Sequence, residues 1–159
     1  FRTDQYGGSD ENKCRFLIET VDKIRKNVGD DFIISIKMNG DDRVTGGITK
    51  ELASKYVSIL NNKIDLFEIS SGLGVAKLPL KPGQKQPEPQ KKNRVERPEG
   101  YNLPSAEYIK KNNPKALIAV VGGIRHKEFV DDILQNDKSD IVSFCRPFLS
   151  NIHFCESLQ

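Results

Sequence analysis

The feature that most constrains the fold is a pair of short apolar runs with one amphipathic segment between them. The first run, Leu117 to Val121, is followed by Gly122-Gly123, and the second, Ile141 to Cys145, is followed by Arg146-Pro147. Because neither run alternates with polar residues, both are expected to be buried on two faces, as parallel strands covered by helices are. The segment His126 to Gln135 has helical periodicity. The pattern predicts a strand–helix–strand unit within a larger parallel sheet.

The residues that follow these two strands suggest an anion site. Glycines at the end of a strand leave backbone N–H groups accessible and let a ligand approach the main chain closely. The planar guanidinium of Arg146 can bind a phosphate through two hydrogen bonds. The carboxyl ends of adjacent parallel strands lie on the same rim, so Gly122, Gly123 and Arg146 are candidates for one phosphate site. Each piece alone is also compatible with an ordinary turn.

The upstream sequence repeats the same alternation of helix and strand. A helix is expected after Ser9 or Asp10, with an apolar stripe that ends at Gly29, and a second helix after the N-cap Thr49. Apolar runs predict strands at Phe32 to Met38 and Ile64 to Ser70, and Pro104 begins a further short helix. Lys37, near the end of its strand, is either a solvated charge or a ligand group.

Four strands in this order indicate an α/β fold, either a doubly wound sheet or part of a (β/α)8 barrel. A complete barrel takes about 250 residues, so a chain of 159 residues can supply only about half of one. The size also predicts a single domain. The chain opens on Phe1 without an initiator Met, which suggests a piece of a longer protein.

Composition excludes several classes of protein. Hydrophobic residues make up 36% and charged residues 30% of the chain, which is ordinary for a water-soluble domain. No apolar run approaches a membrane span and no signal peptide is visible, so a cytoplasmic location without a membrane partner is expected. Cys14, Cys145 and Cys155 are far apart. They predict reduced thiols rather than a disulfide framework or a metal site.

The net charge of +3 is concentrated in one segment, Lys77 to Gly100. This segment is rich in proline and lysine and poor in apolar side chains, so it cannot offset the entropy cost of ordering. It also lacks the aromatic side chains that stack on nucleic-acid bases. We therefore expect a mobile insertion in the domain and no nucleic-acid partner.

Several blocks of the chain resemble the Old Yellow Enzyme family of FMN-dependent NAD(P)H oxidoreductases. The first block combines Arg2, Asp4, Tyr6-Gly7-Gly8-Ser9, Glu11-Asn12 and Arg15-Phe16 in the spacing of a long family signature. The other blocks follow in the family's order and are Ile36–Asn39 with Gly46–Thr49, Glu68–Gly72, Val121–Arg125 and Arg146–Leu149. The resemblance covers nearly the whole chain outside the insertion.

The resemblance implies a (β/α)8 barrel of which this chain is the C-terminal half, with four parallel strands and FMN at their carboxyl rim. It places Lys37 beside the N1/C2 carbonyl side of the flavin, where positive charge stabilises the reduced anionic form. It places Gly122, Gly123 and Arg146 at the FMN phosphate. Cys145, which precedes Arg146, stands where the family usually has glycine, and its Cβ is expected to crowd this cofactor site.

The same resemblance implies that no catalytic residue lies in this chain. The family's substrate-binding His-His or His-Asn pair and its Tyr proton donor belong to the half before strand five, and His126 and His153 do not match them. The implied reaction is hydride transfer from NAD(P)H through FMN to an activated alkene or another electron acceptor. A non-catalytic remnant that keeps the phosphate site, and another phosphate-binding barrel enzyme, remain the alternatives. An isolated half barrel is expected to form a homo-oligomer, because its sheet edges are unpaired.

Overall fold

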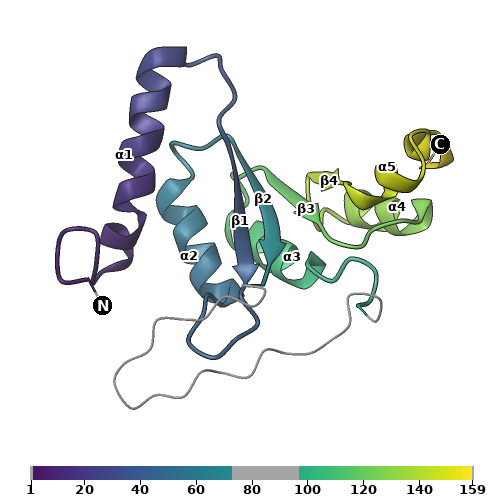
Figure 1. The fold of residues 1–159 in the computed structure, drawn as a ribbon, viewed down its shortest axis with the longest axis horizontal. Coiled ribbons are helices and arrows are strands. Elements are labelled where there is room, and N and C mark those ends of the chain that lie inside the picture. Colours follow the sequence, from purple (N-terminus) through teal and green to yellow (C-terminus); the bar gives the residue numbers. More distant parts are fainter. Residues whose placement is uncertain (1, 73–96, 159) are drawn as a thin grey trace.

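Helices and parallel strands alternate along the chain in the computed structural model, which describes residues 2–72 and 97–158 (Figure 1). The elements are α1 (Asp10–Val28), β1 (Ser35–Asp41), α2 (Lys50–Leu60), β2 (Leu66–Ser71), α3 (Leu103–Asn112), β3 (Ile118–Val121), α4 (Lys127–Gln135), β4 (Ile141–Ser143), α5 (Arg146–Ser150) and the 3-10 turn η2 (Phe154–Leu158). No helix within these ranges combines the length and the apolar character that crossing a membrane requires.

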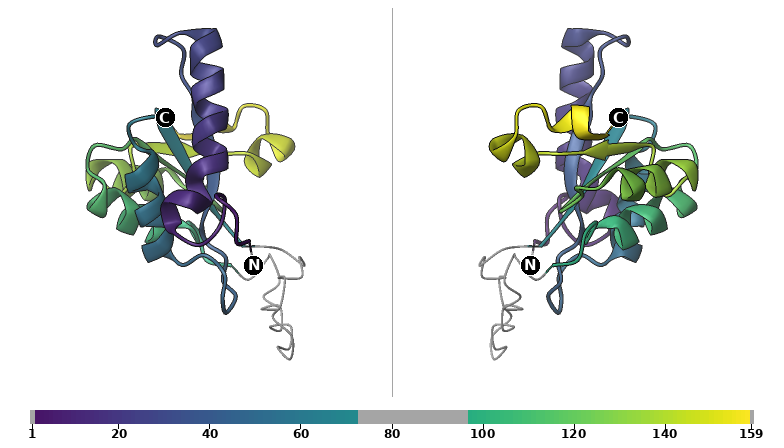
Figure 2. Two further views of the ribbon diagram at one scale, coloured as in Figure 1. Left: turned by 90° about the vertical axis from the view of Figure 1, so that its left-hand side faces the viewer. Right: turned by 90° about the vertical axis from the view of Figure 1, so that its right-hand side faces the viewer.

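The described strands form one sheet in the order β1-β2-β3-β4, and every neighbouring pair is parallel. Sequential order with helical crossovers is the pattern of a (β/α)8 barrel wall, and the chain is the C-terminal half of such a barrel. Helices α2 and α3 cover one face of the sheet, and Figure 2 shows α5 and η2 on the opposite side. The carboxyl ends of all four strands therefore open toward one rim.

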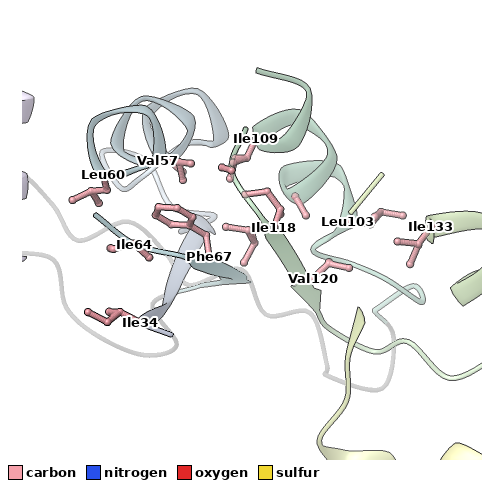
Figure 3. Packing of buried hydrophobic residues seen from close by; sticks show 14 of the residues in the cluster. Ile34, Val57, Leu60, Ile64, Phe67, Leu103, Ile109, Ile118, Val120 and Ile133 are labelled. Atoms are coloured by element: carbon pink, nitrogen blue, oxygen red, sulfur yellow. The ribbon is translucent and has the colours of Figure 1, made fainter. Parts of the chain in front are cut away.

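The hydrophobic core lies between the sheet and α2, α3 and α4 (Figure 3). Phe67 and Ile69 of β2 and Ile118 and Val120 of β3 are completely buried there. Successive strand residues point to opposite faces, so Glu68 and its register neighbour Lys37 point to the other face. That second face is the inner face of the barrel wall, and the core of the described chain is one-sided.

The helix boundaries agree with the capping residues read from the sequence. The Ser9 hydroxyl accepts a hydrogen bond from Asn12 N–H, and the Thr49 hydroxyl accepts one from Leu52 N–H. Gly29 ends α1 with a φ of 82°, a left-handed conformation that favours glycine. The apolar stripe of α1 is less buried than expected, because Val21 is buried but Ile24 and Val28 near its C-terminus are exposed.

The first strand begins three residues later than the sequence predicted. The Arg25 guanidinium takes hydrogen bonds to the carbonyl oxygens of Gly29, Asp30 and Phe32, so the Phe32 carbonyl is not available to a strand ladder. Arg25 also pairs with Asp65 at 2.6 Å, and that carboxylate accepts a hydrogen bond from Ile34 N–H at 2.7 Å. The prediction of a strand from Phe32 was therefore wrong at its start.

The other strand boundaries also moved. Ile64 bonds back to the Leu60 carbonyl in the turn after α2, and β2 starts only at Leu66. The last apolar run forms a strand only over Ile141–Ser143.

Most of the predicted mobile insertion lies outside the described residues, but its last four residues do not behave as predicted. The Gly100 carbonyl accepts a hydrogen bond from Leu103 N–H at 2.7 Å, and a Cβ added to Gly100 would lie 2.3 Å from the Phe129 ring. Arg97 to Gly100 are thus packed against the start of α3 and against α4. The reason is local, because Glu99 and Gly100 find partners that a composition argument does not reveal.

Candidate functional site

A cavity of about 600 Å³ opens at the carboxyl ends of the strands, a size typical of cofactor sites. All five residues that the sequence named for cofactor binding line it, namely Lys37, Gly122, Gly123, Cys145 and Arg146. They come from β1, from the turn after β3 and from the segment after β4. Residues more than 100 positions apart are therefore brought to one site, although their roles there stay predictions.

The glycine turn after β3 is required by its own neighbours. Gly122 and Gly123 have φ values of 144° and 73°, in the region that side chains disfavour. A Cβ on Gly122 would lie 2.7 Å from Asn102 Nδ2, and one on Gly123 would lie 3.1 Å from the Tyr101 ring. The turn is thus packed tightly from one side while its other side lines the cavity.

Asn102, at the N-cap position of α3, holds this turn in place. Its side chain is buried, its Nδ2 donates to the Val121 carbonyl, and its Oδ1 accepts from Arg43 Nη2 at 3.1 Å. Arg43 Nη2 also donates to the Tyr101 carbonyl. One amide therefore links the end of β3 to the loop that follows β1.

Replacing Asn102 by Ala is expected to destabilise the fold by about 1–3 kcal/mol, because the buried Val121 carbonyl and the Arg43 guanidinium each lose a partner. Equilibrium denaturation measures the loss. Asn112→Ala is the matched control, since Asn112 is on the same helix but its amide bonds the Tyr108 carbonyl at an exposed position; it is expected to cost less than about 0.5 kcal/mol. Equal effects of the two substitutions would contradict the bridging role.

Lys37 lies on the inner face of the sheet, and its ammonium group forms an ion pair with Glu68 on the neighbouring strand. The Lys37 side chain remains 56% exposed at the cavity. The sequence left open whether this lysine is solvated or meets a ligand. The structure adds a third partner that sequence reasoning did not name, because strand register decides which side chains are opposite one another.

Arg146 begins α5, and its Nη2 lies 3.3 Å from the Tyr101 hydroxyl oxygen. Cys145 precedes it at an exposed position with a φ of −138°, which any residue adopts without strain. The backbone therefore gives no reason for glycine at position 145. Crowding of a ligand by the Cys145 side chain stays a prediction.

Sequence reasoning missed four further residues of the cavity wall, Arg97, Tyr101, Asn102 and Arg125. With Arg97 and Arg125 the described wall carries four basic side chains and no acidic one. The signal for Arg125 was present, since it closes the block Val121–Arg125. Arg97 was hidden because its segment was interpreted as a mobile loop. Four cations without a carboxylate among them favour an anionic ligand.

The two histidines are away from the described cavity wall. His126 is the N-cap residue of α4 with a side chain 70% exposed, and its Nδ1 lies 2.7 Å from Glu99 Oε2. His153 Nδ1 lies 2.8 Å from Glu156 Oε1. Both are outside the lining of the cavity, which agrees with the expectation that neither is catalytic.

Glu99 fastens the segment before α3 to the loop that follows the glycine turn. Its Oε1 accepts hydrogen bonds from the backbone N–H groups of Arg125 and His126, and its Oε2 contacts the His126 ring. Burial acts to raise the pKa of Glu99, but the hydrogen bonds from the His126 side chain and from the two N–H groups outweigh it. The pKa of Glu99 is therefore held below its ordinary value.

This depressed pKa predicts a pH dependence of stability. The ionised carboxylate stabilises the fold at pH values above the ordinary carboxyl pKa of about 4.3, and the contribution is lost as the pH falls through the folded-state value. Glu99→Gln is expected to lower the melting temperature near neutral pH and to converge with the unchanged protein at acidic pH. Thermal unfolding across this range checks it, with the exposed Glu107→Gln of α3 as control. A difference that does not shrink in acid would contradict the assignment.

Comparison with known proteins gives one consistent result. The model of a family described as NADH:flavin oxidoreductase / NADH oxidase matches residues 1–159. The chain is 31% identical over 156 residues to an NADPH dehydrogenase of Clostridium acetobutylicum, covering 97% of this chain and 41% of that protein. It is 30% identical over 153 residues to an NADH oxidase of Thermoanaerobacter brockii, covering 94% and 21%. The chain thus spans less than half the length of these relatives.

A solved structure shares the fold. The 6-hydroxypseudooxynicotine amine oxidase of Pseudomonas geniculata N1 superposes with a TM-score of 0.73 over 99% of this chain and 22% of that one. The sequence identity is 21%, so the similarity concerns the fold alone.

Proposed function

The chain belongs to the NADH:flavin oxidoreductase / NADH oxidase family, and from this premise we propose that it supplies the phosphate-binding side of an FMN site in an NAD(P)H-dependent flavin oxidoreductase. The family binds FMN, and the relatives include NADPH and NADH enzymes. The single observation that carries the proposal is the cavity wall, in which a glycine turn and four basic side chains face one space without a carboxylate among the described lining residues.

The residues present fit the phosphate end of such a cofactor. The glycine turn follows β3 and Arg146 follows β4, the last two strands of the sheet, and barrel enzymes frequently bind phosphate in the loops after their last two strands. Backbone N–H groups of Gly122 and Gly123 would donate to phosphate oxygens, and the Arg146 guanidinium would neutralise them. Lys37, about a cavity length away on β1, would place positive charge at the ring end.

When bound, FMN takes a hydride from NADH or NADPH and passes it to an acceptor, in the ene-reductase form of the reaction to the β-carbon of an activated alkene. The described residues of this chain bind and orient; we assign none of them to proton transfer, because His126 and His153 face carboxylates outside the cavity wall. Glu68 would moderate the Lys37 charge, since the two side chains form an ion pair at the site.

The proposal is tested on the protein expressed from its complete reading frame. After desalting it is expected to keep the flavin absorbance bands, or to acquire them when FMN is added. A folded, colourless protein that takes up no FMN would contradict the proposal. Flavin that is bound but not reduced by NADH or NADPH would favour the non-catalytic alternative, in which the fold keeps the phosphate site without the reaction.

A further inference from the structure

A second, smaller cavity of about 270 Å³ shares a wall with the first. Arg97, Tyr101 and Arg146 line both cavities, whereas Gly122 and Gly123 line only the first and Ser71, at the end of β2, lines only the second. The rim therefore presents two spaces on either side of one aromatic ring and two guanidinium groups.

Positive charge collects around that ring. The guanidinium carbons of Arg97 and Arg43 lie 5.0 and 5.4 Å from the centre of the Tyr101 ring, and Arg146 Nη2 is 3.3 Å from its hydroxyl oxygen. Burial lowers the pKa of the Arg43 guanidinium, and repulsion from Arg97 lowers it further. Within residues 2–72 and 97–158, neither Arg97 nor Arg146 forms an ion pair with a carboxylate. Stacking on tyrosine only partly offsets such charges.

Ser71 contributes a separate observation at the same place. Its hydroxyl oxygen is buried and has no hydrogen-bond partner. A buried hydroxyl without a partner costs about 1–3 kcal/mol, and such groups in folded proteins usually have a bound partner in function. A group that accepts from Ser71 Oγ and from the two arginines would satisfy all three, and an oxyanion has acceptors on every side.

We propose that the second cavity is an oxyanion subsite, in which Ser71, Arg97 and Arg146 bind a phosphoryl or carboxylate group of the ligand that reacts beside the flavin. The flavin part of this statement rests on the proposed function, but the anion subsite does not. Arg146 has donors on both edges of its guanidinium, so it can serve the glycine-turn cavity and the Ser71 cavity together. Arg97 and Ser71 are then the residues that decide how tightly the second ligand binds.

Equilibrium dialysis of radiolabelled inorganic phosphate at fixed ionic strength tests this on the full-length protein without flavin. Two phosphates are expected per chain, one of which FMN displaces. Arg97→Gln is expected to weaken the remaining site by about 10- to 100-fold, and Ser71→Ala to weaken it without lowering the melting temperature, because the hydroxyl has no partner to lose. Lys26→Gln and Ser58→Ala, at exposed positions of α1 and α2, are the matched controls.

Competition identifies the group that the subsite prefers. Displacement of the remaining phosphate by NADPH but not by fumarate indicates a phosphoryl group of the reductant, and the opposite result indicates an acceptor carboxylate. A single phosphate that FMN displaces and that Arg97→Gln leaves unchanged would overturn the subsite. Two phosphates of which FMN displaces neither would leave the Arg97-dependent site intact and refute the proposed flavin site instead.

Discussion

Arg146→Ala is expected to raise the FMN dissociation constant by about 30- to 1000-fold, because a bidentate charged partner of a phosphate contributes about 2–4 kcal/mol. The side chain lines the cavity beside the glycine turn, and in the described chain its printed contact is one long hydrogen bond to the Tyr101 hydroxyl. Removing it therefore takes away charge at the ligand and little of the fold. Flavin fluorescence titration measures the dissociation constant.

Lys37→Ala is the informative comparison, since it also removes one positive charge from the same cavity. It is expected to change FMN affinity less and to lower the flavin reduction potential, because the Glu68 carboxylate then remains at the ring end without its ion-pair partner. Lys26→Ala on α1 controls for net charge. The assignment of roles fails if Lys37→Ala loses the flavin while Arg146→Ala keeps it.

The second large effect concerns assembly. As a 159-residue polypeptide the chain is expected to self-associate, because β1 and β4 are sheet edges with unpaired backbone groups. Leu117 and Ile141, which alternate onto the inner face, are 51% and 41% exposed. In a closed barrel that face is filled by side chains from the opposite wall. Pairing of two copies would cover both edges and the inner face.

Sedimentation velocity at micromolar concentration measures this association. A dimer or larger species is the expected result, and a charged residue at the inner face, as in Ile141→Lys, is expected to weaken it. Leu149→Lys is the control, because Leu149 is 82% exposed on α5 rather than on the sheet. A compact monomer that unfolds cooperatively would show that the half barrel is self-sufficient.

Periodicity and capping predicted the order of the described elements because these signals are local. Ser9, Thr49 and Gly29 act within one turn of helix, and their effects do not depend on the remainder of the chain. The start of β1 could not be predicted in the same way. It depends on Arg25 reaching the Phe32 carbonyl and on Asp65 bonding Ile34, contacts whose partners become neighbours only in the folded chain.

The candidate site shows the same division. Gly122, Gly123 and Arg146 could be named from their positions after strands, because parallel strands end on one rim. Arg97 could not, since composition marked its segment as unstructured, and only the hydrogen bonds of Glu99 to the loop after the glycine turn reveal why the residues beside it are ordered. The Lys37–Glu68 pair required the strand register.

The most direct measurement is the affinity of the full-length protein for FMN compared with riboflavin, which lacks the phosphate. If the glycine turn and Arg146 bind that phosphate, FMN should bind at least about 30-fold more tightly, and Arg146→Ala should remove most of the difference while leaving riboflavin binding unchanged. Equal affinity for the two flavins, or a preference for FMN that survives Arg146→Ala, would contradict the account.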